Sequence, residues 1–182
     1  YLDGKFGAWL EGNAVVTPDG NVADLLRVDY APGPEYAALI RLRDSVSFDP
    51  FDPEKDFVRM PGGAKKFTVR YDSLSGRYWS LVNYVTQEWA GKQNPAWVRN
   101  TLALSSSPNL QEWTVHRTVL HHPDIAKHGF QYADWLFDGN DIVLLSRTAY
   151  DDNGTGAHNY HDANYMTFHH IKDFRKALTE QA

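Results

Sequence analysis

The chain has 182 residues, a length typical of one domain, and 42% of its residues are hydrophobic, which is enough for a sizeable core. Its formal net charge is −5 and no run of Lys or Arg forms a basic stripe, which argues against a nucleic-acid partner. No stretch approaches the ~18–20 apolar residues of a membrane span, and the absence of cysteine excludes disulfides and thiolate metal sites. The sequence begins with Tyr1 rather than Met, so we expect either a processed start or a piece of a longer protein.

Short runs rich in β-branched and aromatic residues predict strands along most of the chain. In chain order the predicted strands are Val22–Tyr30, Tyr36–Arg43, Lys66–Tyr71, Tyr78–Tyr84, Asn100–Ser105, Trp113–Leu120, Tyr132–Phe137, Asp141–Thr148 and Asn164–His169. Turn-forming sequences such as Pro18-Asp19-Gly20 separate them. Only the tail, Phe174–Ala182, predicts a short helix. The sequence therefore predicts an all-β chain built mostly of hairpins.

A weak internal repeat divides the chain into three units, Val15–Met60, Lys66–Leu120 and Gln131–Leu178. Repeats of about 40–50 residues with four strands each are typical of β-propeller blades. Three blades do not close a ring, because propellers typically need about four to eight. We therefore expect residues 1–182 to form one domain, a partial propeller whose remaining blades lie upstream or come from a partner, such as a second copy. A twisted β-sandwich is the alternative fold.

An acid–base pair frames the first predicted hairpin. Glu11 precedes a strand, the Asp19-Gly20 turn follows eight residues on, and the next strand delivers Arg27. A hairpin of that length can return both side chains to the same end of the sheet, where they form either an ordinary salt bridge or part of a site.

This spacing resembles that of sialidases, which carry Glu, then Asp-Gly eight and nine residues later, then Arg at sixteen. Further landmarks follow in the family's order: Arg99 opens a strand and Tyr132 precedes one, with Ala133 in place of the family's Ser and Asp134 next to it. The turn between them resembles a degenerate Asp-box hairpin without its Gly, formed by Ser107, Asn109, Gln111 and Trp113.

The resemblance implies the C-terminal part of a sialidase-type propeller, with about three four-stranded antiparallel blades of a six-bladed ring. It implies Tyr132 as the nucleophile, Glu11 as the base that takes its proton, and Arg27 and Arg99 as two guanidiniums of a carboxylate clamp. Planar guanidiniums bind carboxylates bidentately, which selects an acidic sugar. The family's first Arg and its Asp acid/base have no counterpart here, since they lie in earlier blades.

The polar loop from Asp151 to Asn164 departs from the family pattern. It carries His158 and His161 and has three interpretations: a solvated loop, a substrate-contacting loop or a metal site. Two His three residues apart fall below the specificity of a zinc motif, so no metal or cofactor is predicted. The predicted substrate-binding set is Arg27, Arg99, Asp134, His158 and His161.

Three functions remain open from the sequence. The first is an exo-acting glycoside hydrolase that cleaves an acidic sugar through Tyr132. The second is a polysaccharide lyase or other glycosidase in which Tyr132 and His158 or His161 transfer protons. The third is a non-catalytic carbohydrate-binding propeller, because one fold hosts many functions. An extracellular or periplasmic location is implied by the resemblance alone.

Overall fold

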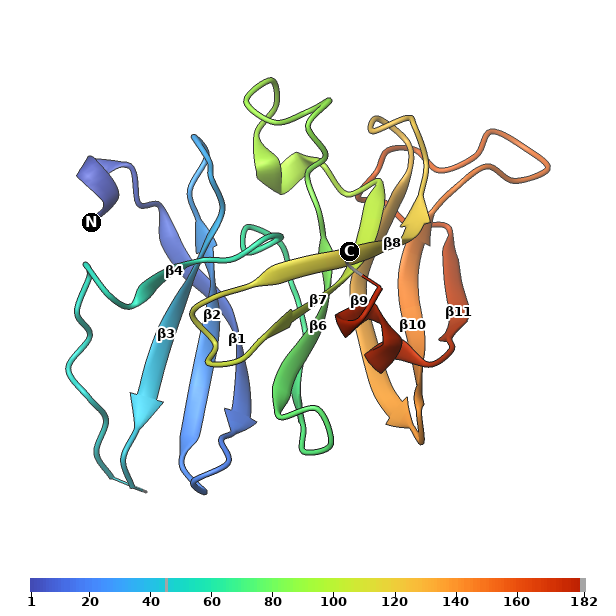
Figure 1. The fold of residues 1–182 in the computed structure, drawn as a ribbon. Coiled ribbons are helices and arrows are strands. Elements are labelled where there is room, and N and C mark those ends of the chain that lie inside the picture. The colour runs from blue at the N-terminus through green and yellow to red at the C-terminus, as the bar shows by residue number, and fades with distance from the viewer. Residues whose placement is uncertain (45, 181–182) are drawn as a thin grey trace.

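The computed structural model describes residues 1–44 and 46–180. In these ranges it is all-β, with three antiparallel sheets side by side and only short 3₁₀ helices before, between and after them (Figure 1). The all-β prediction and the partial propeller are confirmed. None of the helices within the described ranges is long and apolar enough to cross a membrane.

The first sheet has the order β1-β2-β3-β4 and the second the order β5-β6-β7-β8. Their strands are β1 (Ala8–Val16), β2 (Val22–Asp29), β3 (Tyr36–Leu42), β4 (Phe57–Arg59), β5 (Val69–Asp72), β6 (Arg77–Asn83), β7 (Thr101–Ser107) and β8 (Thr114–His121). Short hairpins join β1 to β2 and β5 to β6, as the turn sequences predict. The 3₁₀ helices η1 (Leu2–Gly4) and η2 (Pro95–Trp97) lie in the flanking loops.

The third sheet has three strands rather than the predicted four, in the order β11-β10-β9. They are β9 (Gly129–Asp138), β10 (Asp141–Ala149) and β11 (Tyr165–Ile171). After β11 the chain turns into the 3₁₀ helix η3 (Phe174–Leu178), whose Phe174 ring packs edge-on against Trp79 of the second sheet. The tail thus caps the interface between two sheets instead of adding a strand. The predicted helix extended to Ala182, and its last two residues lie outside the described part of the chain.

The second sheet is buried on both faces because β6 alternates between two cores. Tyr78 and Val82 pack in the core shared with the first sheet, whereas Trp79 and Leu81 pack in the core shared with the third. Burying each such side chain contributes about 1.5–3 kcal/mol. The run Tyr78-Trp79-Ser80-Leu81-Val82, which has no apolar–polar alternation, is therefore the sequence of a central blade.

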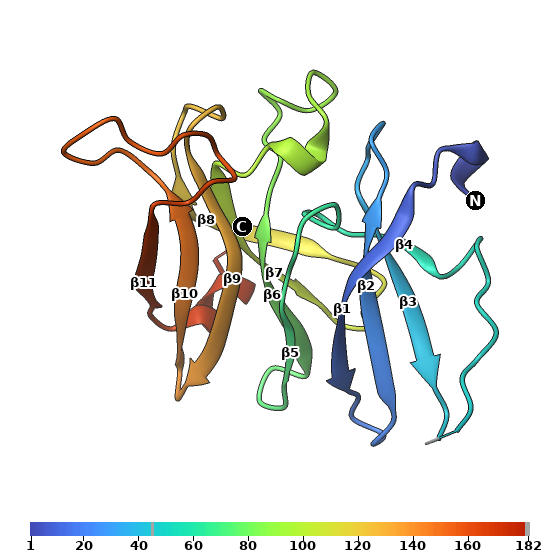
Figure 2. The ribbon, with the colours of Figure 1, turned by 180° about the vertical axis from the view of Figure 1, so that it is seen from behind.

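The first strands of the three sheets, β1, β5 and β9, lie next to one another (Figure 2). Asn13 on β1 exchanges two hydrogen bonds of 3.1 Å with the Val69 backbone on β5. Trp135 on β9 donates from its indole to the Thr68 carbonyl at 3.0 Å, and Arg70 donates back to the Trp135 carbonyl at 2.6 Å. Polar side chains thus join the inner strands of consecutive sheets.

The outer face of the third sheet is apolar and exposed. Leu136, Leu145, Met166 and Phe168 each expose about half or more of their surface, and Leu145 pairs with Phe168 across β10 and β11. Contiguous apolar faces of this kind are normally covered. A further propeller blade on this face stays a prediction.

The η3 helix is tied to the second sheet through Asp72. The two carboxylate oxygens of Asp72 accept hydrogen bonds from Arg175 at 2.6 and 2.7 Å, and one of them also accepts from the Ser75 backbone at 3.0 Å. Burial raises the pKa of Asp72, but these hydrogen bonds outweigh it and lower the pKa to about 2. The pair therefore stabilises the fold above pH ~4 and loses its effect as the pH falls towards 2.

We expect Asp72→Asn to lower the free energy of unfolding by about 2–3 kcal/mol at pH 7, because a charged hydrogen-bond acceptor for Arg175 is lost. The difference between the variant and the native protein should shrink between pH 4 and pH 2, where the native carboxyl takes up its proton. Thermal unfolding followed at several pH values measures both effects, and an equal difference at pH 7 and pH 2 would contradict this role.

Candidate functional site

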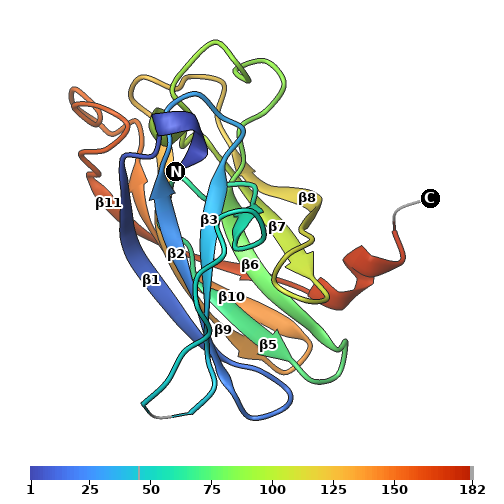
Figure 3. The ribbon, with the colours of Figure 1, turned by 90° about the vertical axis from the view of Figure 1, so that its left-hand side faces the viewer.

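The predicted site residues lie at the end of the sheets where the long loops gather. The loops after β2, β6, β8 and β10 all lie at the upper end in Figure 1, and Figure 3 shows the same end from the side. The short hairpin turns after β1, β5 and β9 lie at the opposite end. Loops on a rigid scaffold are where binding and catalytic groups concentrate.

Arg99 lies at the centre of a cluster with Gln131, Tyr132 and Tyr160, and it is 5% exposed. Its Nε donates to the Ala96 carbonyl at 3.0 Å and its Nη1 donates to the Gln131 side-chain oxygen at 2.7 Å. Its guanidinium carbon lies 5.8 Å from the ring centres of both Tyr132 and Tyr160. Burial lowers the pKa of Arg99, while the Tyr132 side chain opposes this shift. No carboxylate pairs with Arg99 among the described residues.

Tyr132 has a backbone conformation that is rare for a residue with a side chain. Its φ is +51°, in the left-handed region, which costs about 1–2 kcal/mol. The pairing of β9 with β10 shifts at this point, because Leu145 faces Asp134 but Arg147 faces Gln131. The resulting β-bulge re-aims the Tyr132 side chain, and such strain concentrates at functional sites.

Tyr132 and Asp134 line a polar cavity of about 440 Å³ where the three inner strands meet. Arg70 also lines it, and its guanidinium lies 3.4 Å from the Asp134 carboxylate. The Asp134 side chain is mostly exposed and also accepts a hydrogen bond from the Trp135 backbone. Asp134 therefore lies in the same cavity as Tyr132, already paired with a cation.

Glu11 and Arg27 form an ion pair with an N–O distance of 3.2 Å. Arg27 is held further by a 2.8 Å hydrogen bond from its Nε to the Ala64 carbonyl. Its positive charge is close enough to Arg99 to contribute to the lowered pKa of that residue. The structure thus brings Arg27, Arg99 and Tyr132 into one region and pairs Glu11 with Arg27; no contact joins Glu11 to Tyr132 among the described side chains.

The loop after β10 contributes backbone rather than imidazoles to the site. The His161 carbonyl accepts hydrogen bonds from Arg147 at 2.5 Å and from Gln131 at 3.0 Å. The His161 ring faces Asp162, 3.5 Å away, and His158 is exposed. Neither imidazole contacts Tyr132 among the described residues, and the lyase interpretation stays a prediction.

Several site residues escaped prediction from the sequence. Lys65 is 1% exposed and pairs with Glu35 and the Pro95 carbonyl beside Arg99. Gln131 joins Arg99 to the loop after β10. Arg147 lies 5.2 Å from the Tyr132 ring centre. The sequence did contain a signal for Arg147. An Arg that directly follows the hydrophobic run of a strand is unusual, because charged residues are seldom buried without a partner.

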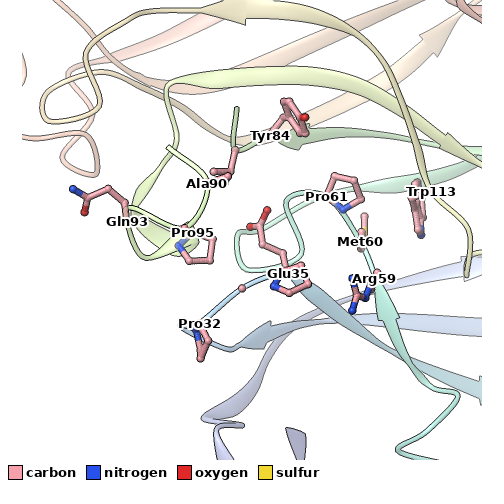
Figure 4. Close-up of a pocket in the computed structure, with 14 residues that line it drawn as sticks. Pro32, Glu35, Arg59, Met60, Pro61, Tyr84, Ala90, Gln93, Pro95 and Trp113 are labelled. Carbon is pink, nitrogen blue, oxygen red and sulfur yellow. The ribbon is translucent and has the colours of Figure 1, made fainter. Parts of the chain in front are cut away.

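A larger cavity of about 550 Å³ lies between the first two sheets (Figure 4). Glu35 lies in its wall, between Pro95 and Gln93 on one side and Met60, Pro61 and Trp113 on the other. Its lining is mostly apolar, and none of the predicted catalytic or substrate-binding residues belongs to it. It adjoins the Arg99 cluster through the segment that contains η2.

One group of residues in the described ranges brings three potential metal ligands together, His122, His128 and Asp151, with ligand atoms within 4.8 Å of one another. The two imidazoles are stacked, with ring centres 3.4 Å apart and an interplanar angle of 15°. Lone pairs of parallel rings do not converge on one ion. His122 Nδ1 also accepts a hydrogen bond from the Asp124 backbone, so we assign no metal to this group.

No protein-family model and no curated protein matches the chain. Among solved structures, the chain is similar to an α-L-arabinofuranosidase from Fusarium graminearum in complex with an iminosugar inhibitor (TM-score 0.52, 9% identity, 96% of this chain and 47% of that one). It is also similar to an α-L-arabinanase from Penicillium chrysogenum complexed with arabinobiose (TM-score 0.51, 11% identity, 91% and 46%). The chain spans about half the length of the structures it matches. At this identity the likeness establishes the fold, a portion of a β-propeller also used by glycoside hydrolases.

Proposed function

We propose that this chain is part of a carbohydrate-active propeller that hydrolyses glycosides of an acidic sugar, with Tyr132 as nucleophile and Arg99 as the main carboxylate-binding residue. The observation that carries the proposal is the buried, carboxylate-free guanidinium of Arg99 beside a strained tyrosine. The two similar structures support the glycosidase part, because they are those of an α-L-arabinofuranosidase and an α-L-arabinanase.

An anionic ligand would neutralise the positive charge of Arg99. A buried guanidinium without a counter-charge costs several kcal/mol. A substrate carboxylate at this position would pair with it through charge-assisted hydrogen bonds, which are about twice as strong as neutral ones. Arg27 adds positive charge next to Arg99 and holds Glu11 in place.

Tyr132 supplies the nucleophile in the proposed reaction. Its phenol oxygen forms a bond to the anomeric carbon while the bond from that carbon to the leaving-group oxygen breaks, and the leaving oxygen keeps the electron pair. The phenol proton passes to the Glu11 carboxylate. Water then attacks the anomeric carbon and the bond from that carbon to the Tyr132 oxygen breaks, which releases the sugar. The Tyr132 oxygen takes back the proton held by Glu11, and the proton lost by the water ends on the leaving-group oxygen. Substrate binding has to bring Glu11, now paired with Arg27, to the phenol.

The remaining predicted residues have supporting roles in this proposal. Asp134 shapes the charge of the cavity that Tyr132 lines. His158 and His161 belong to the loop whose backbone carbonyls hold Gln131 and Arg147. A secreted location is part of the same proposal, since it rests on the same resemblance.

Binding measurements test the anion requirement without relying on turnover. Titration calorimetry with D-glucuronate and N-acetylneuraminate should show binding of at least one of them, with D-glucose as the neutral control. Arg99→Gln should weaken the binding of that acid by about 10–100-fold, because a hydrogen bond to a charged group is worth about 1.5–3 kcal/mol. Equal binding of the acid by the native protein and the variant would rule out Arg99 as the anion site.

A further inference from the structure

The cations around Tyr132 fall into two groups according to their partners. Arg27 pairs with Glu11, Lys65 with Glu35 and Arg70 with Asp134, so their charges are compensated within the protein. Arg99 and Arg147 have no carboxylate partner among the described residues: both donate to carbonyl or amide oxygens, and Arg99 also interacts with the Tyr132 phenol. Lys66, which lines the cavity with Tyr132, is likewise free of a carboxylate partner there and donates to the Phe67 carbonyl. The second group therefore contains the guanidiniums that an anionic ligand can claim.

Arg147 lies on β10 opposite Gln131, at the bulge that re-aims Tyr132. It is half-buried, and its guanidinium carbon lies 5.2 Å from the Tyr132 ring centre. Its Nη2 donates to the His161 carbonyl at 2.5 Å, whereas its Nε and Nη1 have no hydrogen-bond acceptor among the described residues. The guanidinium is therefore anchored through Nη2, and its Nε and Nη1 can donate hydrogen bonds to a ligand.

Gln131 links the two uncompensated guanidiniums. Its side-chain oxygen accepts from Arg99 Nη1 at 2.7 Å, and its amide nitrogen donates to the carbonyls of Tyr160 and His161 at 2.7 and 3.0 Å. The His161 carbonyl is also the acceptor for Arg147. Arg99, just before β7, and Arg147, on β10, are thus held by one network before any ligand binds. Such preorganisation reduces the entropy lost on binding.

We propose that Arg147 is a further substrate-binding residue, which together with Arg99 holds the anionic group of the acidic sugar next to Tyr132. The inference rests on the proposed function and adds a specific division of roles. Arg99 from the second sheet and Arg147 from the third contact the anion, while Arg27 acts through its charge and through Glu11. This differs from the clamp that the sequence resemblance implies, in which Arg27 is a direct contact.

The division of roles predicts an order of effects on binding. Arg147→Gln should weaken the binding of the acid that the native protein binds, D-glucuronate or N-acetylneuraminate, by at least 10-fold. Arg147→Lys should recover part of the loss, because it keeps the charge but not the planar fork. Arg27→Gln should weaken binding by less than 3-fold. D-glucose serves as the neutral control in each titration.

Arg77→Gln is the matched control, since Arg77 also lacks a carboxylate partner but donates to Ser106 in the second sheet. Thermal unfolding of each variant shows that the fold is kept. If Arg147→Gln binds the acid like the native protein while Arg99→Gln does not, the role of Arg147 is refuted and the proposed function stands. If the native protein binds neither acid, both fail.

Discussion

Replacement of Tyr132 by Phe is expected to abolish hydrolysis while leaving the anion site intact. The variant keeps the ring that lies near Arg99 and Arg147 but lacks the oxygen that attacks the anomeric carbon. Loss of a nucleophile lowers kcat by about 10³-fold or more. Release of the aryl alcohol from 4-methylumbelliferyl glycosides of D-glucuronate and N-acetylneuraminate measures turnover, and an aryl leaving group departs without needing an acid.

Binding of the free sugar acid separates chemistry from structure in this experiment. Tyr132→Phe should bind the acid within about 3-fold of the native protein, because the guanidiniums are untouched. Tyr71→Phe is the matched control, since Tyr71 lies on β5, outside the cluster around Arg99. Turnover by Tyr132→Phe at the native rate would show that the phenol is not the nucleophile. Absence of turnover from the native protein, with the acid still bound, would instead support the binding-only interpretation of the propeller.

Replacement of Glu35 by Gln should cause the largest loss of stability at this end of the molecule. Lys65 is 1% exposed and has Glu35 as its only carboxylate partner among the described residues. Removing one member of a buried ion pair leaves the other charge uncompensated, at about 3–5 kcal/mol. Urea unfolding followed by tryptophan fluorescence measures the change. Asp49→Asn, which removes an exposed pair with Arg43, should cost no more than about 1 kcal/mol.

The pH dependence of this loss has a definite sign. Burial lowers the pKa of Lys65, and the Glu35 carboxylate opposes that shift. Without Glu35 the folded protein gives up the Lys65 proton more readily than the unfolded chain does. The stability of the variant therefore rises with pH between the pKa of Lys65 in the folded protein and its pKa in the unfolded chain. The deficit of Glu35→Gln relative to the native protein should therefore shrink from pH 7 towards pH 10, and Lys65→Met in the same background should restore part of the stability. A deficit that grows with pH would contradict the role of the buried ammonium.

The fold was accessible from the sequence because strand and turn signals are local. Seven of the nine predicted strands agree with observed strands to within two residues at both ends, and the Asp138-Gly139-Asn140 turn joins β9 to β10 as expected. Predicting Lys66–Tyr71 as a strand placed its start too early, since residues before Val69 belong to the buried loop that carries Lys65. The missing fourth strand of the last sheet depends on how Phe174 packs against Trp79, a tertiary contact without a local signal.

The site was accessible in part. The resemblance picked out Arg27, Arg99 and Tyr132, which the structure brings into one region. The bulge at Tyr132 was not predictable, because it depends on the register between β9 and β10. Arg147 and Gln131 become site residues only through that register. Whether a cation has a carboxylate partner likewise depends on distances in the folded chain. The sequence alone could therefore not show that Arg27 is paired and Arg147 is not.

A crystal structure of the native protein with a bound sugar acid, D-glucuronate or N-acetylneuraminate, tests the central claim most directly. The account predicts the carboxylate oxygens at about 2.7–2.9 Å from the guanidinium nitrogens of Arg99, with Arg147 completing the contact and the sugar ring beside Tyr132. A sugar bound in the 550 Å³ cavity between the first two sheets, with the Arg99 cluster unchanged, would contradict it.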